Sequence, residues 1–218
     1  MYKALRYTVF APVALSLSAF FSPCFASVVY DESINGDLST DFSNPSSVLI
    51  QAGSNQILGT TGRADGVVDR DYFTITIPQG LRLTRIEVLP NTTGDNIDTP
   101  ISFISVQTGA TGTNPSTAQA PLAASLLGYY LFGPADIGQD ILDNLGQSNQ
   151  LFLPAQGFTT PLGAGIYTFW VQETAVNLIN YGIDLQVQPV PVPAAVWLFG
   201  SGLIGLFRSK KSGGLQVA

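Results

Sequence analysis

Alternating apolar and polar residues near the C-terminal end of the chain constrain its fold more than any other feature. Between residues 181 and 188 every second side chain is apolar, and most of those in between are polar. This two-residue period places the apolar side chains on one face of a β-strand. The same alternation recurs at residues 73–77 and 166–172. Each of these segments is therefore expected to be a strand with one buried face.

Shorter strand-like runs and frequent turn signals fill the rest of the middle of the chain. The runs lie at residues 28–30, 48–52, 56–61, 83–89 and 101–107, and the turns lie at 78–80, 93–96, 109–112 and 161–165. Short strands at such spacing predict an all-β fold, an antiparallel and jelly-roll-like β-sandwich.

One helix is expected inside this fold. Asp136 can cap its first turn, Gln139 completes a capping-box pattern, and Gly146 can end it. The apolar residues of this segment form one stripe, made of Ile137, Ile141, Leu142 and Leu145. Residues 122–127 could form another helix, so we expect one or two short helices in all.

Composition and charge exclude several classes of function. The chain of 218 residues has no histidine, one cysteine and one methionine, which argues against a histidine base, a catalytic thiolate or a histidine-bearing metal site. Five of the nine basic residues lie at the two ends, so the middle holds four basic and all 15 acidic residues, a net charge of −11. Nucleic-acid binding requires a basic surface, which this middle region does not have.

The first 26 residues have the three parts of a secretory signal peptide. A basic start is followed by an apolar stretch at residues 9–21 and by a small-x-small ending at Ala26. The pattern predicts entry into the export machinery and cleavage by signal peptidase between Ala26 and Ser27. Cleavage there would remove Cys24, the only cysteine, so the mature protein would contain no disulfide.

The C-terminal end combines a proline motif, an apolar run and a basic cluster. The motif is Val190, Pro191, Val192, Pro193, Ala194 and Ala195, and the cluster is Arg208, Lys210 and Lys211. As a helix, residues 194–207 would be roughly 21 Å long, less than the hydrocarbon core of a bilayer at about 30 Å. One interpretation of this segment is a plain C-terminal membrane anchor.

This C-terminal pattern also resembles the PEP-CTERM sorting signals, in the variant that opens with Val-Pro-x-Pro-Ala-Ala. Val192 stands where the founding motif has glutamate, and residues 212–218 form a tail beyond the basic cluster. The resemblance implies an exported protein of a Gram-negative bacterium that is held transiently in the inner membrane by its C-terminal apolar helix. It further implies cleavage near the proline motif by an exosortase-like membrane protease, and transfer to the cell surface or to an extracellular polysaccharide matrix.

The middle region carries a second resemblance. Residues 69–80 make an Asp-x-Asp-aromatic step into a strand that ends at a Pro-x-Gly turn, and they resemble the bacterial pre-peptidase C-terminal (PPC-like) domains. Residues 163–172 and the final strand are similar to the closing hairpin of those domains. The resemblance implies a small β-sandwich and no particular chemistry. The expected organisation is a signal peptide at 1–26, a sandwich domain at 27–189, a sorting segment at 190–211 and a tail at 212–218.

Carboxylates supply the remaining candidate sites. Asp65, Asp69 and Asp71 lie close together around a glycine-containing loop and could provide the oxygen ligands that calcium prefers, although aspartate also favours turns by bonding its own backbone. Catalysis by two carboxylates is not expected, because Glu87, Glu173 and Asp184 lie at positions that the strand patterns place in solvent. Trp170, expected on the polar face of its strand, could stack on a sugar ring if it is exposed.

The function expected from the sequence is a non-catalytic structural or interaction role at the cell surface or in the extracellular matrix, with no cofactor other than calcium. A calcium- or carbohydrate-binding module is the alternative, and a carboxylate-dependent hydrolase ranks third.

Overall fold

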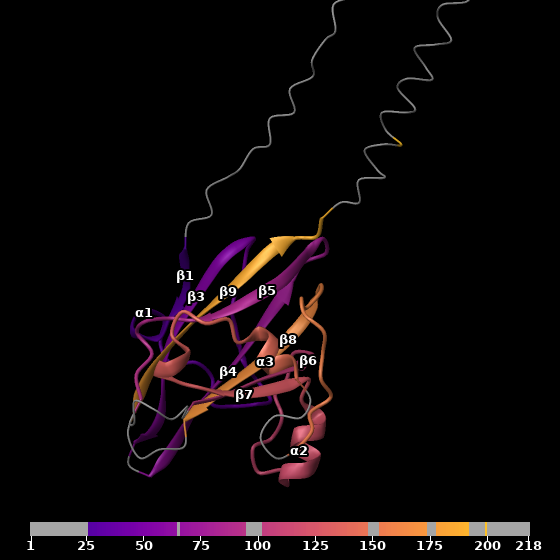
Figure 1. Ribbon diagram of the computed structural model, residues 1–218. Coiled ribbons are helices and arrows are strands. Elements are labelled where there is room, and N and C mark those ends of the chain that lie inside the picture. The colour runs from indigo at the N-terminus through magenta and orange to yellow at the C-terminus, as the bar shows by residue number, and fades with distance from the viewer. Residues whose placement is uncertain are drawn as a thin grey trace, which may run out of the picture.

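The computed structural model describes residues 26–64, 66–94, 102–147, 153–173 and 178–191, together with Phe199 (Figure 1). Several predicted features lie outside these residues. They are the signal segment up to residue 25, Asp65, Val192, Pro193, Ala194 and Ala195 of the proline motif, and, apart from Phe199, the apolar run with Arg208, Lys210 and Lys211. No helix of the described residues has the length and apolar character needed to cross a bilayer.

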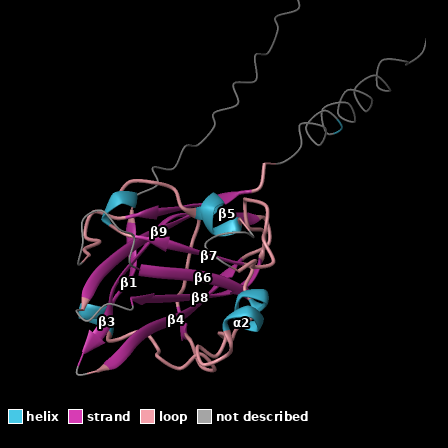
Figure 2. Cartoon of the chain, turned by 60° about the horizontal axis from the view of Figure 1, so that its bottom comes forward, coloured by secondary structure: helices cyan, strands magenta, loops and turns pink. Residues whose placement is uncertain are grey.

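Two packed sheets form the domain, which confirms the predicted all-β fold. The first sheet has the strand order β1 (Ser27–Asp31), β3 (Gly53–Ala64), β9 (Ile179–Pro189) and β5 (Leu81–Val88). The second has the order β2 (Ser46–Ser47), β4 (Val67–Ile77), β8 (Gly165–Glu173), β6 (Ser102–Thr108) and β7 (Gly128–Phe132), and Figure 2 shows its last four strands side by side. All pairings are antiparallel except those of β1 with β3 and of β2 with β4.

The two sheets are continuous through one hairpin. Residues 62–64 at the end of β3 pair with residues 67–69 at the start of β4. The rest of β3 belongs to the first sheet and the rest of β4 to the second. The hairpin therefore folds the sheets face to face, and β3 and β4 lie together along one side of the sandwich, which we call the β3/β4 edge.

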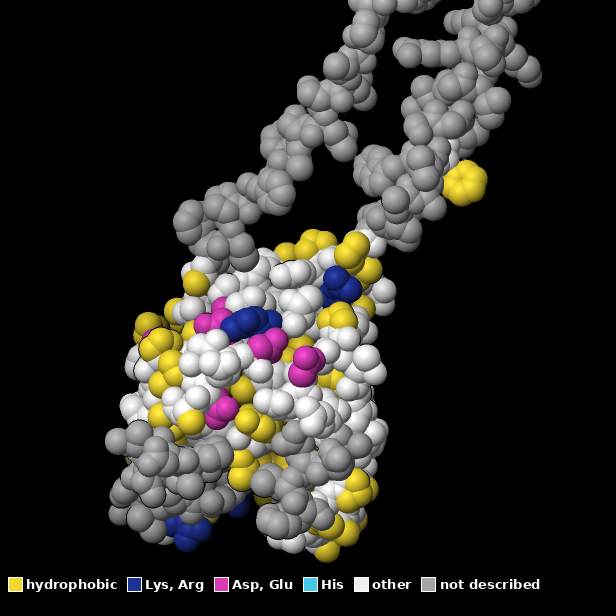
Figure 3. Space-filling model, in the orientation of Figure 1, with side chains coloured by type: hydrophobic (Ala, Val, Ile, Leu, Met, Phe, Trp, Pro, Cys, Tyr) yellow, Lys and Arg dark blue, Asp and Glu magenta, His cyan; other side chains and the backbone are white. Residues whose placement is uncertain are grey.

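The alternation of the strands places the core between the sheets. Ile183 and Leu185 of β9 face Phe73 of β4 and Phe169 of β8, and all four side chains are fully buried. The rings of Phe73 and Phe169 stack with centroids 5.2 Å apart. Burial of each such side chain contributes about 1.5–3 kcal/mol to stability, so no disulfide is needed. On the face shown in Figure 3, only a few charged side chains interrupt an otherwise uncharged surface.

The helical segments are short. They are α1 (Glu32–Asn35), α2 (Gln119–Ser125), the 3-10 turn η1 (Pro134–Asp136) and α3 (Leu142–Gly146). The prediction of one helix from Asp136 to Gly146 is wrong. Gly138 has a φ of +79°, which interrupts a helix, and the chain around it pairs with β5 through Val88–Ile137 and Glu87–Asp140 bridges. The apolar stripe is nevertheless buried, because Ile141, Leu142 and Leu145 pack into the core.

Two strand predictions also differ from the structure. Residues 48–52 are not a strand, since β2 ends at Ser47 and the Asn55 side chain accepts a hydrogen bond from the backbone N–H of Gln51. Strand β7 was not predicted. It forms the edge of the second sheet by pairing with β6.

Candidate metal centre

An N-terminal segment, residues 27–48, covers the β3/β4 edge. It pairs with the first sheet through β1 and β3. It then passes to the second sheet, where the Ser39 carbonyl accepts a hydrogen bond of 2.8 Å from Tyr72 N–H and β2 pairs with β4. The candidate site lies where this segment passes from one sheet to the other.

Glu32 is fixed at the start of helix α1. Asp31 caps the helix, because its carboxylate accepts a hydrogen bond of 2.9 Å from Ser33 N–H. The Glu32 carboxylate then accepts hydrogen bonds from Leu38 N–H (3.0 Å) and Thr60 N–H (2.7 Å). These bonds join the N-terminal segment to strand β3 and hold the carboxylate in one orientation.

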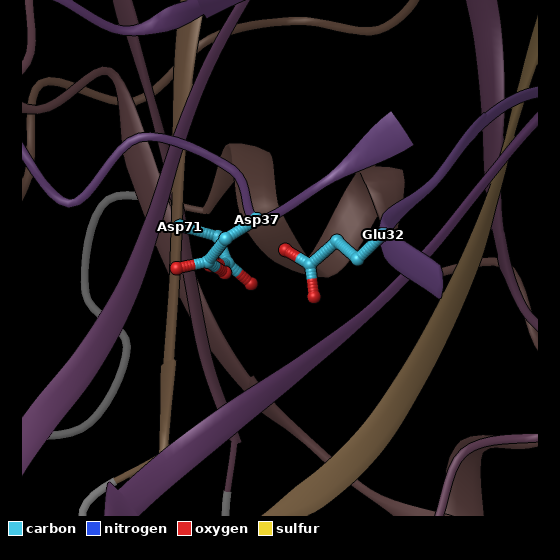
Figure 4. Close-up of side chains that lie close together, drawn as sticks. All are labelled: Glu32, Asp37 and Asp71. Carbon is cyan, nitrogen blue, oxygen red and sulfur yellow. The ribbon is translucent and has the colours of Figure 1, made fainter. Parts of the chain in front are cut away.

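Asp37 reaches the same place through a glycine turn. Gly36 ends helix α1 with a φ of +87° and a ψ of 169°, a conformation that is essentially restricted to glycine. The reversal directs the chain back so that the Asp37 carboxylate lies beside that of Glu32 (Figure 4). Asp37 is exposed, and it leaves the site one side that is open to solvent.

Asp71 supplies the third carboxylate from strand β4. It shares the inward face of the strand with Phe73 and Ile75 and is fully buried, with 0% of its surface exposed. Neither of its carboxylate oxygens has a hydrogen-bond partner of normal geometry, and the polar side chain beside them on the inner side is the Tyr181 hydroxyl, whose interaction offsets only part of the rise that burial causes in the pKa of Asp71. One oxygen each from Asp71, Glu32 and Asp37 lies within 4.8 Å of the others, and Figure 4 shows the Glu32 carboxylate pointing toward the two aspartates.

The electrostatics of the cluster favour a positive ligand. Burial, followed by the charge of Glu32, raises the pKa of Asp71 well above its usual value. Burial and then the charges of Asp37 and Glu32 raise the pKa of Asp69 to about 6. Burial also raises the pKa of Glu32, despite its hydrogen bonds. The ion pair between Arg85 and Glu87 involves none of these carboxylates, and no basic side chain of the described residues lies within ion-pair distance of the cluster.

The Tyr181 hydroxyl lies on the inner side of the site. It projects from β9 of the facing sheet and is fully buried without a hydrogen-bond partner of normal geometry. Burial and the Asp71 charge raise the pKa of this hydroxyl. The ring lies against Gly59 of β3, where an added Cβ would approach the hydroxyl oxygen to 2.6 Å. The glycine therefore makes room for the Tyr181 hydroxyl beside Asp71.

The spacing of the carboxylates suits one hard cation. Calcium binds oxygen ligands at about 2.3–2.6 Å, so two ligands on opposite sides of the ion are about 5 Å apart. The three oxygens of this site, at 4.8 Å or less from one another, can therefore touch a single calcium ion. Three carboxylates provide six oxygens, and the open side at Asp37 can admit water to complete the coordination.

The structure brings together only part of the predicted calcium set. Asp71 is in the cluster, Asp69 precedes it on the same face of β4 and interacts with Glu32 and Asp37 through its charge, and Asp65 lies outside the described residues. Arg70, which separates the two aspartates in sequence, donates a hydrogen bond of 2.7 Å to Gln172 on the other face of the strand. Sequence reasoning missed Glu32 and Asp37, because more than 30 residues separate them from Asp71 and no local spacing links them.

Trp170 is not the exposed platform that sugar stacking needs. Its ring is only 7% exposed, stacks on Tyr72 with centroids 5.4 Å apart and meets Phe103 edge-on at 4.9 Å. The residue does alternate with core residues and so lies on the outer face of its sheet. Phe42, which packs edge-on against Tyr72, belongs to a segment that covers this face.

Two carboxylates that were expected in solvent are also buried. Asp184 accepts hydrogen bonds from Ser54 Oγ and Asn55 N–H, both 2.8 Å long, and Glu173 is 1% exposed at the end of β8. Neither belongs to the cluster of Glu32, Asp37 and Asp71.

The predicted processing positions lie at the two ends of the folded domain. Ala26 is exposed, and Ser27 begins strand β1. Val190 follows the last residue of β9 and donates a hydrogen bond to the Gly80 carbonyl, and Pro191 is exposed. Comparison with family models, curated proteins and solved structures gave no match for this chain.

Proposed function

We propose that the protein is an exported, non-catalytic β-sandwich that binds a divalent cation of calcium type at the β3/β4 edge. One observation carries this proposal. The Asp71 carboxylate is fully buried, has no hydrogen bond of normal geometry and faces the carboxylates of Glu32 and Asp37. Burial and the neighbouring carboxylates disfavour the ionised form of Asp71, and an oxygen-binding cation is the ligand that would compensate three ionised carboxylates at once.

The chemistry of the cluster favours binding over catalysis. The side chains of this site are carboxylates and a phenol, and hydrolysis by two carboxylates requires an acid and a base on opposite sides of a substrate. Here the three carboxylate oxygens lie within 4.8 Å of one another, which leaves space for an ion and not for a sugar ring. A structural or regulatory ion is therefore the better interpretation.

Delivery to the cell surface is the second part of the proposal. The PEP-CTERM-like segment would place the protein in the inner membrane until an exosortase-like protease cleaves it, after export and signal peptidase cleavage. Support comes from the extent of the fold, because β1 begins at Ser27 and β9 ends at Pro189. The folded domain thus occupies the interval between the two predicted processing sites. An extracellular polysaccharide matrix is the proposed destination.

Thermal unfolding in chelator and in calcium tests the cation site. At a free calcium concentration of 100 times the Kd, a ligand that binds only the folded state adds about 2.7 kcal/mol, which raises Tm by roughly 5–10 °C for a domain of this size. The Asp71→Asn variant should lose this rise, and Asp184→Asn, which alters a buried aspartate outside the cluster, should retain it. An unchanged Tm of the unsubstituted protein at millimolar calcium would contradict the proposal.

A further inference from the structure

The cation ligands come from two parts of the fold, which at the site itself are joined through the hydrogen bond from Thr60 N–H of β3 to the Glu32 carboxylate. Glu32 and Asp37 belong to the N-terminal segment, whereas Asp71 belongs to the body of the sandwich. We infer that the cation holds the N-terminal segment, residues 27–48, on the β3/β4 edge, so that loss of the ion loosens this segment while the remaining sandwich stays folded. This inference rests on the proposed function.

The contacts of the segment with the sandwich are local and modest. Strand β1 pairs with β3 over four residues, and its register shifts between Val28 and Tyr30. Strand β2 pairs with β4 over two residues. By comparison, β9 pairs with β3 over nine residues, from Gly53–Val187 to Thr61–Ile179. Residues 27–48 are therefore held in the two sheets by shorter runs of paired residues than strand β9 is.

The segment also buries little apolar surface. Of its apolar side chains, Leu38 and Val48 are buried, at 1% and 3% exposure, while Ile34 is 79% exposed. Val29 and Tyr30 are partly buried against the core, and Phe42 is partly buried against Tyr72. Regions with few buried apolar contacts open locally at a lower free energy than the core. Mutual repulsion of Glu32, Asp37 and Asp71 lowers this free energy further when no cation is present.

Opening of the segment would remove two of the three carboxylates from the site. The open form therefore retains Asp71 alone from the cluster and binds the cation far more weakly than the closed form. A ligand that binds only the closed form shifts the opening equilibrium by the factor 1 + [L]/Kd. At 100 times the Kd, calcium should reduce the open population about 100-fold.

The open form would also leave two strand edges without partners. The backbone groups of β3 that pair with residues 27–31 and those of β4 that pair with Ser46 and Ser47 would become accessible. Tyr72 N–H would lose the Ser39 carbonyl. Hydrogen exchange at these groups of β3 and β4 would therefore detect opening of the segment without relying on the amides of residues 27–48.

Hydrogen exchange measured by mass spectrometry on the purified protein, in calcium and in chelator at pH 7.5, tests the inference. We expect calcium at 100 times its Kd to slow exchange about 100-fold at the amides of Leu38, Val48, Thr60 and Tyr72, which bond to the segment or belong to it. Exchange in the middle of β9, which pairs with β3 and β5, should change by less than threefold.

Two variants complete the test. Asp37→Asn changes an exposed residue, leaves the core intact and should reduce the calcium effect at the segment at least tenfold. Asp184→Asn, outside the cluster, should leave the calcium effect unchanged.

Calorimetric titration with calcium separates the two possible failures. If no heat of binding is seen, the proposed cation site is wrong. If calcium binds but residues 27–48 gain no more protection than β9, the site stands and the inference about the segment is overturned.

Discussion

Asp71 on β4 and Asp184 on β9 are both buried, but hydrogen bonds of normal geometry reach only Asp184. Asp184 accepts bonds from Ser54 Oγ and Asn55 N–H, whereas neither oxygen of Asp71 accepts a bond of normal geometry. In the part of the chain that the structure describes, these are the two buried aspartates. The difference predicts opposite responses to the same substitution.

Asp71→Asn should raise the stability of the cation-free protein at pH 7.5, and Asp184→Asn should lower it. The first change replaces a buried carboxylate, which Glu32 and Asp37 repel, with a neutral amide of the same size and so removes the cost of a buried charge. The second weakens charge-assisted bonds, at a loss of about 1.5–3 kcal/mol. Urea unfolding in chelator measures both. Destabilisation by Asp71→Asn in chelator would mean that the carboxylate has a structural partner and no need of a cation.

The cation-free protein should become less stable as pH rises from 4 to 8. Asp69 has a folded pKa of about 6, and those of Asp71 and Glu32 are raised, against an unfolded value near 4. The folded state therefore binds more protons than the unfolded state in this range. The stabilisation is fully present below about pH 4 and is lost as pH rises through 6 and above.

Calcium should reverse this trend. The ion binds the ionised carboxylates, so its affinity should increase with pH over the same range. Tm measured at pH 5 and pH 8, with calcium and with chelator, checks both directions. A cation-free Tm that increases between these pH values would contradict the raised pKa of Asp69 and the repulsion behind it.

Gly36→Ala should weaken cation binding without a steric clash. An added Cβ at Gly36 has nothing within 4 Å, but the φ of +87° and ψ of 169° are strained for alanine, at a cost of about 1–3 kcal/mol. We expect Asp37 to shift and the calcium Kd to increase about tenfold or more. Gly138→Ala is the matched control, because Gly138 also has a positive φ and open surroundings, in the turn beside β5. Equal losses of calcium affinity in the two variants would argue against a role of the Gly36 turn in the site.

The sorting segment predicts a processed C-terminus. The intact mass of the protein recovered from the exporting cell should correspond to a chain that starts at Ser27 and ends near Pro193. Replacing Pro191 and Pro193 by alanine should block C-terminal cleavage and leave signal peptide removal unchanged. A mature chain that still ends at Ala218 would favour the plain membrane anchor.

The strands could be predicted because each has a strong two-residue period. Phe73, Ile75 and Ile77 share one face, and the same period extended back to Asp71 places its carboxylate on that inward face. A buried aspartate was therefore predictable from the alternation alone. Its partners Glu32 and Asp37 were not, because the N-terminal segment reaches β4 only when the two sheets pack together.

The missed helix shows a different limit. The stripe of Ile141, Leu142 and Leu145 fits a helix, and all three residues are buried. Pairing with the edge of β5 satisfies the backbone of residues 137–141 equally well, as in the 2.9 Å bond from Ile141 N–H to the Ile86 carbonyl. Helix propensity alone cannot decide between a helix and this pairing, because the outcome depends on the edge of β5 that is available to residues 137–141 in the folded domain. Burial of Trp170 likewise depends on segments that are distant in sequence.

Strand β9 immediately precedes the proposed sorting segment and lies between β3 and β5 in the first sheet. If the protein is attached to the cell surface through its C-terminal end, as proposed, any pulling force on the domain enters through this central strand. Extracting β9 along its axis requires two hydrogen-bonded ladders to shear at the same time, whereas an edge strand would resist through one. The position of β9 thus suits the domain to mechanical load at its point of attachment.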